Sequence, residues 1–476
     1  MLLPIVLATV GATPYGIWLV LSTLAMVLNY SDLGVGAAVV HFASRHRGGR
    51  GDHDLSKLLS AALMWNFAAA LVVVPTYVLF AISYTRGQVD SGAIDGGETD
   101  WLVVAGAFVM AGLFIRPFGS ALVGSGLLPL ERRNASVAAV VRVIGTLAVC
   151  YYVPSVGAVA TVEAAAALLP SILSMLTVWR RGLAKVRWDR STFSVGRHML
   201  SFSTRSFVVS LIGALLLQGG TFAAGVLIGP ASASYFNAAF RVYSSVRQLI
   251  GWLIDPFRAA MSRAAATDGN ESTRLLASLS TVIALCVSVG CGALIFSSGW
   301  LIPLWLGQSA PTNDVQLGVI ILLTGLIANS IHLPFVPAAD SIGRPGVFLG
   351  PQLLWLTIFA VSAGPLAQAL GAPGIALAMS LPLILVEPVY LLVARRVLHF
   401  DMREWFLHCI LPAAIAAGGA ALLVLVLRAL TEYVLDASLP GWLYGGLFAI
   451  VSLLGILIYH GWKIPPAFGL VLRSKL

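Results

Sequence analysis

Charged residues are scarce in this sequence of 476 residues. Asp, Glu, Lys and Arg together make up 10% of the chain and hydrophobic residues 58%, whereas soluble domains carry roughly 25% charged residues. A water-facing surface for a chain of this length cannot be built from so few charges. Their scarcity excludes an ordinary soluble fold and predicts that lipid is the solvent for most of the surface.

Cysteine patterns and catalytic motifs are missing as well. The four cysteines lie in apolar runs without a C-x-x-C pair, so the sequence predicts neither a disulfide framework nor a metal site. No phosphate-binding P-loop, G-x-S-x-G or H-E-x-x-H motif occurs. The loops expected outside the membrane are too short for a catalytic domain, so a non-enzyme is expected.

Long apolar runs dominate what is present. They are continuous and reach the length of about 20 residues that a helix needs to cross a hydrocarbon core. Strands of a membrane barrel would be shorter and would alternate in hydrophobicity, so we expect an all-α polytopic membrane protein. The expected spans are a partial first segment at 1–11, taken as a truncated first helix, and then 15–43, 58–83, 101–127, 135–154, 156–179, 199–228, 232–257, 275–298, 316–342, 346–369, 373–394, 405–429 and 441–460.

The net charge is +9, and the distribution of the basic residues among the loops is explained by membrane topology. When the spans alternate from an N-terminus inside, the inner loops hold 22 of the 29 Lys and Arg residues, and the outer loops hold only Arg86 and Arg428. Cytoplasmic loops of membrane proteins are enriched in Lys and Arg. The bias therefore predicts that both termini are cytoplasmic, and it argues against a nucleic-acid partner.

A weak internal repeat links the two halves of the chain. PFGSALVGSG at 117–126 lies 217 residues before PFVPAADSIG at 334–343, and the corresponding spans run in the same direction. Prolines and glycines around both segments are expected to bend the helices there. A parallel repeat is a recurrent transporter plan with the binding site at the repeat interface. The expected domains are an N-terminal lobe at 1–185, a basic linker at 186–198, a second lobe at 199–400, and an extra helix pair with a tail at 401–476.

Three segments resemble the polysaccharide and oligosaccharide (Wzx-like) flippase family, which belongs to the MOP superfamily together with MATE exporters and the lipid II flippase. They are TPYGIWLVLSTLAMVLNYSDLGVGAAVVHFASR at 13–45, LLLQGGTFAAGVLIGPASASYFNAAFR at 215–241 and LGAPGIALAMSLP at 370–382. The chain departs from the family at its incomplete first helix and at Gln218, which is followed by glycines where an acidic residue is frequent.

The resemblance implies two pseudo-symmetric six-helix lobes that rock around a central cavity, plus two C-terminal helices. It implies a flippase that moves undecaprenyl-diphosphate-linked sugars across the bacterial inner membrane for lipopolysaccharide or exopolysaccharide synthesis. Implied partners are the lipid-linked oligosaccharide, membrane lipids, a polysaccharide polymerase and export proteins, with no cofactor besides H+ or Na+ coupling. A MATE-type drug or cation antiporter is the second hypothesis, and a membrane polysaccharide polymerase or ligase the third.

Arg241 is the leading candidate for a substrate-binding residue. It lies ~13 Å into the span that starts near residue 232, too deep to reach either surface easily. At 100° per residue a polar stripe falls on its side of the helix; the stripe comprises Asn237, Ser244, Ser245, Gln248 and Asp255. A guanidinium can bind a diphosphate bidentately while staying charged. The alternative is a buried ion pair that fixes lobe packing.

The other ionisable residues within spans leave more alternatives open. Arg116 and Arg247 are further candidates for the substrate cavity. The alternative for Arg116, in the inner third of its span, is extension toward the inner surface, and the alternative for Arg247 is packing. Asp32, Glu163 and Asp255 are candidates for ion coupling, although Asp32 also suits a helix bend and Glu163 also suits a partner for an arginine. Two more residues carry expectations of other kinds: Arg142 is expected to extend toward the inner surface, and Glu387 to pair with an inner arginine.

Overall fold

The computed structural model describes residues 2–29, 34–47, 54–186, 190–267, 269–307, 310–342, 344, 346–433 and 439–459. All regular secondary structure within these ranges is helical. In lipid a helix satisfies its own backbone hydrogen bonds, so continuous apolar runs of this length fold as helices. The predicted all-α class is confirmed.

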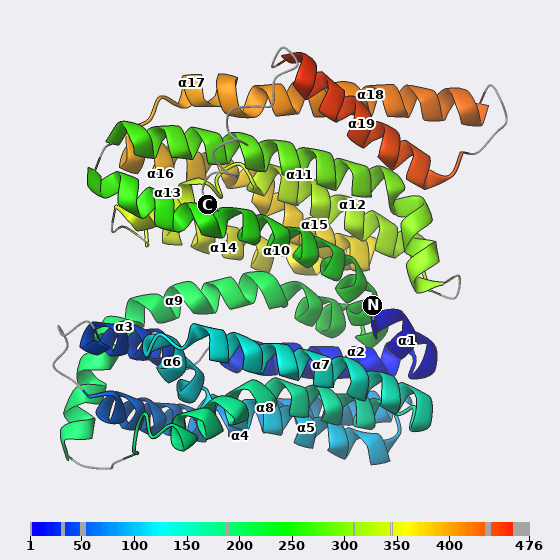
Figure 1. Cartoon of the computed structure of the whole chain (residues 1–476). Coiled ribbons are helices and arrows are strands. Elements are labelled where there is room, and N and C mark those ends of the chain that lie inside the picture. Colours follow the sequence, from blue (N-terminus) through cyan, green and yellow to red (C-terminus); the bar gives the residue numbers. More distant parts are fainter. Residues whose placement is uncertain are drawn as a thin grey trace. The chain divides into compact units, whose positions relative to one another are not determined.

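The chain forms two compact units, Met1–Ser234 and Tyr235–Leu476. The first unit contains α1 (Leu2–Thr9), α2 (Ala12–Asn29), α3 (Val35–Arg47), α4 (Leu55–Asp90), α5 (Gly96–Ile115), α6 (Pro117–Gly124), α7 (Leu128–Tyr152), α8 (Val156–Arg180) and α9 (Arg190–Leu227). Helix α10 (Pro230–Thr267) begins in the first unit and continues in the second. The second unit also contains α11 (Gly269–Leu306), α12 (Thr312–Asn329), α13 (Phe335–Ser341), α14 (Leu349–Leu370), α15 (Ala372–Leu385), α16 (Glu387–Leu398), α17 (Met402–Trp405), the π-helical turn η1 (Phe406–Ile410), α18 (Leu411–Tyr433) and α19 (Gly441–Tyr459) (Figure 1).

Eleven stretches of the described chain are long and apolar enough to cross a membrane. Helix α4 illustrates their character, because Leu71, Val72 and Leu79 are 62%, 67% and 70% exposed. Leucine and valine exposed to this extent on one stretch of a helix suit contact with lipid tails rather than with water. The protein is therefore a multi-pass membrane protein.

Three of the predicted spans lie outside these eleven, and all three are helical. Helix α1 has only 8 residues, too few to span by itself. Helix α9 has a shorter apolar stretch at Leu211–Leu227. Helix α10 carries Arg241 and Arg247 within the predicted span, which lowers its hydropathy without shortening it.

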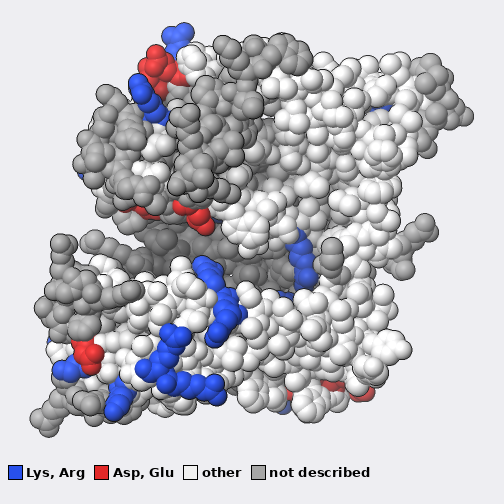
Figure 2. Space-filling view, in the orientation of Figure 1, with Lys and Arg blue, Asp and Glu red and all other residues white. Residues whose placement is uncertain are grey.

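Lys and Arg gather at one end of the first unit (Figure 2). Lys57 lies at the start of α4, Arg132 in the first turns of α7, and Arg180 at the end of α8. Because successive packed helices run antiparallel, these three positions fall at the same end of the unit. The clustering agrees with the charge bias along the sequence, whereas the side of the membrane stays a prediction.

Several predicted spans are broken in the structure. The span at 101–127 divides into α5 and α6 at Arg116, and the span at 316–342 divides into α12 and α13 before Phe335. Proline lacks a backbone N–H and clashes with the preceding turn, and Pro117 and Pro334 stand at the two breaks. The predicted bends are thus present. The predicted span at 15–43 is likewise two helices, α2 and α3, and not one.

The same order of packing occurs inside each unit. In the first unit α4 packs on α5, α5 on α8, and α8 on α7. In the second unit α11 packs on α12, α12 on α15, and α15 on α14. The breaks at Pro117 and Pro334 occupy corresponding places in these two series, which agrees with the repeat seen in the sequence.

The boundary between the two packed units lies further along the chain than the predicted linker at 186–198. Helix α9 packs against α2 and α4, so the first unit extends to Ser234. The predicted lobes follow the order of the repeat rather than packing, and their boundaries stay a prediction. Within the predicted pair at 401–476, α18 and α19 pack on each other and on α11 (Figure 1).

Candidate functional site

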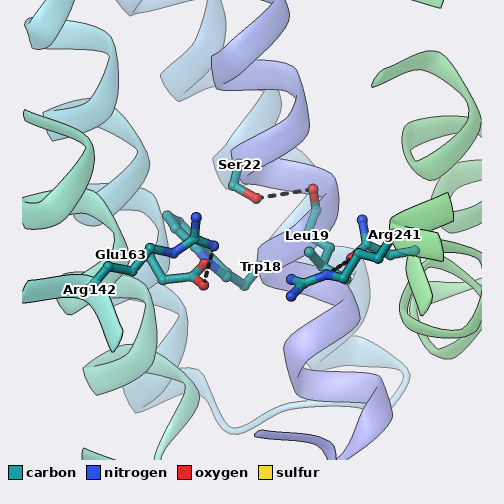
Figure 3. Close-up of polar contacts among 7 residues, drawn as sticks. Trp18, Leu19, Ser22, Arg142, Glu163 and Arg241 are labelled. Carbon is teal, nitrogen blue, oxygen red and sulfur yellow. Dashed lines mark hydrogen bonds and ion pairs between the residues drawn. The ribbon is translucent and has the colours of Figure 1, made fainter. Parts of the chain in front are cut away.

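A carboxylate inside the first unit is held by two donors from two other helices. Glu163 on α8 accepts a hydrogen bond from Arg142 Nη2 on α7 at 2.8 Å and one from Trp18 Nε1 on α2 at 2.7 Å (Figure 3). The side chain of Glu163 is 11% exposed and that of Arg142 42%. Each carboxylate oxygen therefore has one donor, and the cluster ties α2, α7 and α8 together.

The expectation that Arg142 extends to the inner surface is wrong. Helix α7 begins at Leu128, seven residues before the predicted span. Arg142 is therefore about 21 Å along the helix and meets Glu163 there. Glu163 accordingly has the arginine partner that was one of its two expected roles, while its role in ion coupling stays a prediction.

The polar side chains predicted around Arg241 lie together on α10. Arg241 Nε donates to Asn237 Oδ1 at 2.9 Å, and the Ser244 and Ser245 hydroxyls donate to the Arg241 carbonyl oxygen at 3.1 and 2.8 Å. Arg241 is half-buried and lies 11 residues after the start of α10, about 16 Å along the helix. The bond that Arg241 Nε donates to Asn237 orients the plane of the guanidinium.

The remaining residues of that stretch of α10 lie in other surroundings. Arg247 Nη1 donates to Asn329 Oδ1 on α12 at 3.2 Å, which places Arg247 at a contact between two helices of the second unit. Gln248 and Asp255 are exposed. Their proposed roles in a substrate path or in ion coupling stay predictions.

Arg116 lies at the break between α5 and α6. Its Nη1 donates to the carbonyl oxygen of Asn29 at 2.8 Å, and Asn29 Nδ2 donates to the carbonyl oxygen of Val109 at 3.2 Å. Asn29 is the last described residue of α2, so these bonds link this part of α2 to α5 and to the break after it. Asp32, the neighbouring candidate, lies outside the described residues.

Glu387 pairs with a histidine rather than with the expected inner arginine. His332 Nδ1 and Glu387 Oε2 are 2.7 Å apart, and both side chains are 6% exposed. His332 lies between α12 and α13, and Glu387 is the first residue of α16. His332 was not predicted, because its partner is 55 residues away in the sequence. Its position, two residues before the repeated motif that begins at Pro334, was a signal that could have indicated it.

These clusters combine fixed positive charge with neutral donors and acceptors. Arg142 and Arg247 each have a hydrogen-bond acceptor on a second helix, and Arg241 Nε is held by Asn237 of its own helix. A guanidinium so oriented can offer planar, bidentate donors to a phosphate or carboxylate group.

No protein-family model matches the chain, and no curated protein sequence matches it. Solved structures do match. The lipid II flippase MurJ, in an inward closed conformation, has a TM-score of 0.70 at 15% identity, over 96% of this chain and 95% of that chain. An inward-facing multidrug resistance MATE family transporter of the MOP superfamily has a TM-score of 0.67 at 14% identity, over 83% and 93%. A MOP superfamily transporter from Pyrococcus furiosus, with a binding pocket of reversed polarity, has a TM-score of 0.55 at 16% identity, over 83% and 88%.

These likenesses establish the fold. The chain is similar to a lipid flippase over nearly the whole length of both proteins and has the fold of the MOP-superfamily transporters. At such low identity the fold alone is shared, since one fold hosts different functions and the site decides between them.

Proposed function

We propose that the protein is a flippase for lipid-linked oligosaccharide. It moves sugars attached to undecaprenyl diphosphate from the cytoplasmic to the outer leaflet by alternating access. The observation that carries this proposal is Arg241, which is oriented by Asn237 about 16 Å along a helix of a protein with a flippase-like fold.

The chemistry of the substrate suits an arginine at this depth. A charged side chain near the centre of a membrane helix costs about 2.5–3.5 kcal/mol, so it is kept where it binds something. A diphosphate has several anionic oxygens that planar guanidinium donors can bind in pairs. The neighbouring Asn237, Ser244 and Ser245 supply the amide and hydroxyl groups that suit sugar hydroxyls.

An antiporter for drugs or cations fits the side chains less well. Such a transporter needs a carboxylate that is available to a cationic substrate. The two buried glutamates of the described membrane helices are engaged, Glu163 by Arg142 and Trp18 and Glu387 by His332. This engagement favours an anionic lipid-linked substrate over a cationic drug.

Location and partners follow from the same proposal. The basic end of the first unit, marked by Lys57, Arg132 and Arg180, faces the cytoplasm, as the enrichment of cytoplasmic loops in Lys and Arg requires. Both termini are then cytoplasmic in the inner membrane of a bacterium. A polysaccharide polymerase and export proteins would use the flipped product on the outer side.

Complementation tests the proposal. The protein is produced in a bacterial strain that lacks its lipid-linked oligosaccharide flippase, and surface glycan is measured. We expect the wild type to restore glycan, Arg241→Ala to abolish it, and Arg241→Lys to restore part of it, because lysine keeps the charge but not the bidentate geometry. Arg132→Ala is the matched control, since the Arg132 side chain is 75% exposed, and it should behave as the wild type.

Protein levels in the membrane must be equal for all variants. Full glycan display by Arg241→Ala at normal protein level contradicts the role of Arg241. Failure of the wild type to restore glycan, combined with acquired resistance to toxic organic cations, contradicts the flippase and supports the antiporter.

A further inference from the structure

Two broken membrane helices of the second unit meet at one buried titratable pair. His332 lies in the interruption between α12 and α13, and Glu387 lies just after the interruption between α15 and α16. The 2.7 Å contact between His332 Nδ1 and Glu387 Oε2 therefore joins the two breaks directly. Breaks of this kind are the places where membrane transporters bend and bind ions.

The surroundings of the pair are aromatic and leave one carboxylate oxygen unsatisfied. The Tyr390 ring stacks on the His332 ring with 3.9 Å between centroids and 9° between planes, and Phe348 lies 6.2 Å from His332 on the same measure. Glu387 Oε1 is buried without a hydrogen-bond partner among the described residues. A buried acceptor without a partner costs about 1–3 kcal/mol, which a second role for this oxygen would explain.

One fixed positive charge lies close to the pair. Arg247 on α10 donates to Asn329, three residues before His332, and is close enough to Tyr390 to act on it electrostatically. When Glu387 is ionised and His332 is neutral, Arg247 balances the negative charge. Adding one proton to Glu387, beside a neutral His332, gives the pair no charge and leaves the cluster at +1. This form avoids the desolvation cost of the two buried charges that an ion pair would carry. Other charged groups on the packed helices lie toward helix ends and are Asp314 on α12, Asp340 on α13, and Arg395 and Arg396 on α16.

The pair differs from the other membrane carboxylate in the nature of its partner. Glu163 is held by Arg142, and an arginine keeps its proton at every accessible pH. Glu387 is held by a histidine, a residue type that can be neutral or charged near neutral pH. Of these two described pairs, the Glu387 pair is therefore the one that can gain or lose a proton without breaking an arginine–carboxylate bond.

We propose that His332 and Glu387 form a proton-binding site that couples the transport cycle to a proton gradient. This role rests on the proposed function, because the flippase substrate is what the proton would be exchanged against. A proton suits the site better than Na+, because hard cations prefer several oxygen ligands and this pair offers one carboxylate amid aromatic rings. Since the contact joins two helix breaks, binding a proton there changes how firmly the breaks are held together.

Infrared difference spectroscopy on the purified full-length protein tests proton binding without any transport. Spectra recorded across the range pH 5 to 8 should show the carbonyl stretch of a protonated carboxylic acid growing as the pH falls. We expect Glu387→Gln to remove this band and His332→Gln to move its midpoint by about one pH unit or more. His408→Asn is the matched control, because His408 contacts a backbone carbonyl on an exposed surface, and it should leave the band unchanged.

The second arm measures coupling in cells. Glycan display by the wild type should fall at least tenfold when an uncoupler abolishes the proton gradient, and Glu387→Gln should be inactive while remaining monodisperse in detergent. A missing band, or one that survives Glu387→Gln, overturns the proton site whatever the transport result. A band that Glu387→Gln removes, with glycan display unaffected, overturns the coupling and leaves the flippase standing. A wild type that restores no glycan overturns the flippase alone, since the infrared result still decides whether the site binds a proton.

Discussion

Replacing Glu163 by Gln removes the charge that holds Arg142 while keeping the shape of the side chain. Arg142 then loses a charge-assisted bond of 2.8 Å, and the remaining amide oxygen can serve Arg142 or Trp18 but is a weaker acceptor for both. Hydrogen bonds to charged groups contribute about 1.5–3 kcal/mol. Because the Arg142 side chain is 42% exposed and water can replace part of the lost contact, we expect a loss near the lower half of that range, about 2 kcal/mol.

A second ion pair, on the surface, serves as a matched control for this expectation. Arg428 and Glu432 on α18 form a bond of the same 2.8 Å length, but their side chains are 53% and 38% exposed. An exposed pair spaced i,i+4 contributes only about 0.3–0.5 kcal/mol. Glu432→Gln should therefore cost several times less stability than Glu163→Gln, although both remove a carboxylate from an equally short contact.

Thermal unfolding of the detergent-purified protein, followed by size-exclusion chromatography, measures both variants. About 2 kcal/mol should lower Tm by about 4–8 °C for a unit of this size, and Glu432→Gln should lower it by about 2 °C or less. The double variant Arg142→Gln, Glu163→Gln should lose less than the sum of the single losses, since the two residues interact. Equal Tm values for the two glutamine variants would refute the assignment of Glu163 as a structural tie of the first unit.

Two further predictions concern helix contacts in the second unit. A Cβ at Gly325 on α12 would lie 2.7 Å from Ser380 Oγ on α15, so Gly325→Ala should lower Tm because overpacking costs about 1–3 kcal/mol of stability. At Gly290 a Cβ meets nothing within 4 Å, so Gly290→Ala should leave Tm unchanged or raise it. Equal effects of the two substitutions would contradict the packing argument. Trp405 Nε1 donates to Ser280 Oγ at 2.9 Å between buried side chains. Ser280→Ala alone should lower Tm because it leaves the donor unpaired, and adding Trp405→Phe should recover part of the loss. A double variant less stable than Ser280→Ala would contradict this explanation.

The hydropathy of the sequence was enough to predict the helical architecture, because in lipid every backbone polar group must find a hydrogen-bond partner within the protein. Every apolar run must be a helix, so existence and approximate bounds follow from the sequence. Pro117 and Pro334 indicated the two breaks, since proline removes a backbone donor. Proline alone does not decide this, because Pro75 and Pro170 lie inside the continuous helices α4 and α8. The span at 15–43 was wrongly taken as one helix because the change from α2 to α3 has no proline to mark it.

Partners of charged side chains could be predicted much less well. The stripe around Arg241 was visible because its members share one helix, where angular spacing fixes the face. The partners of Arg142 and Glu387 lie outside the helices that carry these two residues, and angular spacing along a single helix does not reveal a partner on another part of the chain. Such partners follow only from the way the helices pack.

The two buried carboxylates show why partner chemistry matters more than burial. Both Glu163 and Glu387 lie within helical membrane segments, and by burial alone either would suit a coupling role. Arg142 is a permanent cation, and its bond to Glu163 serves as a fixed tie between α7 and α8. The partner of Glu387 is a histidine, a residue type that can be neutral or charged near neutral pH, and this pair lies where two helices are broken. The first unit is therefore expected to keep one arrangement of its charges throughout a transport cycle, while the second unit can respond to a proton.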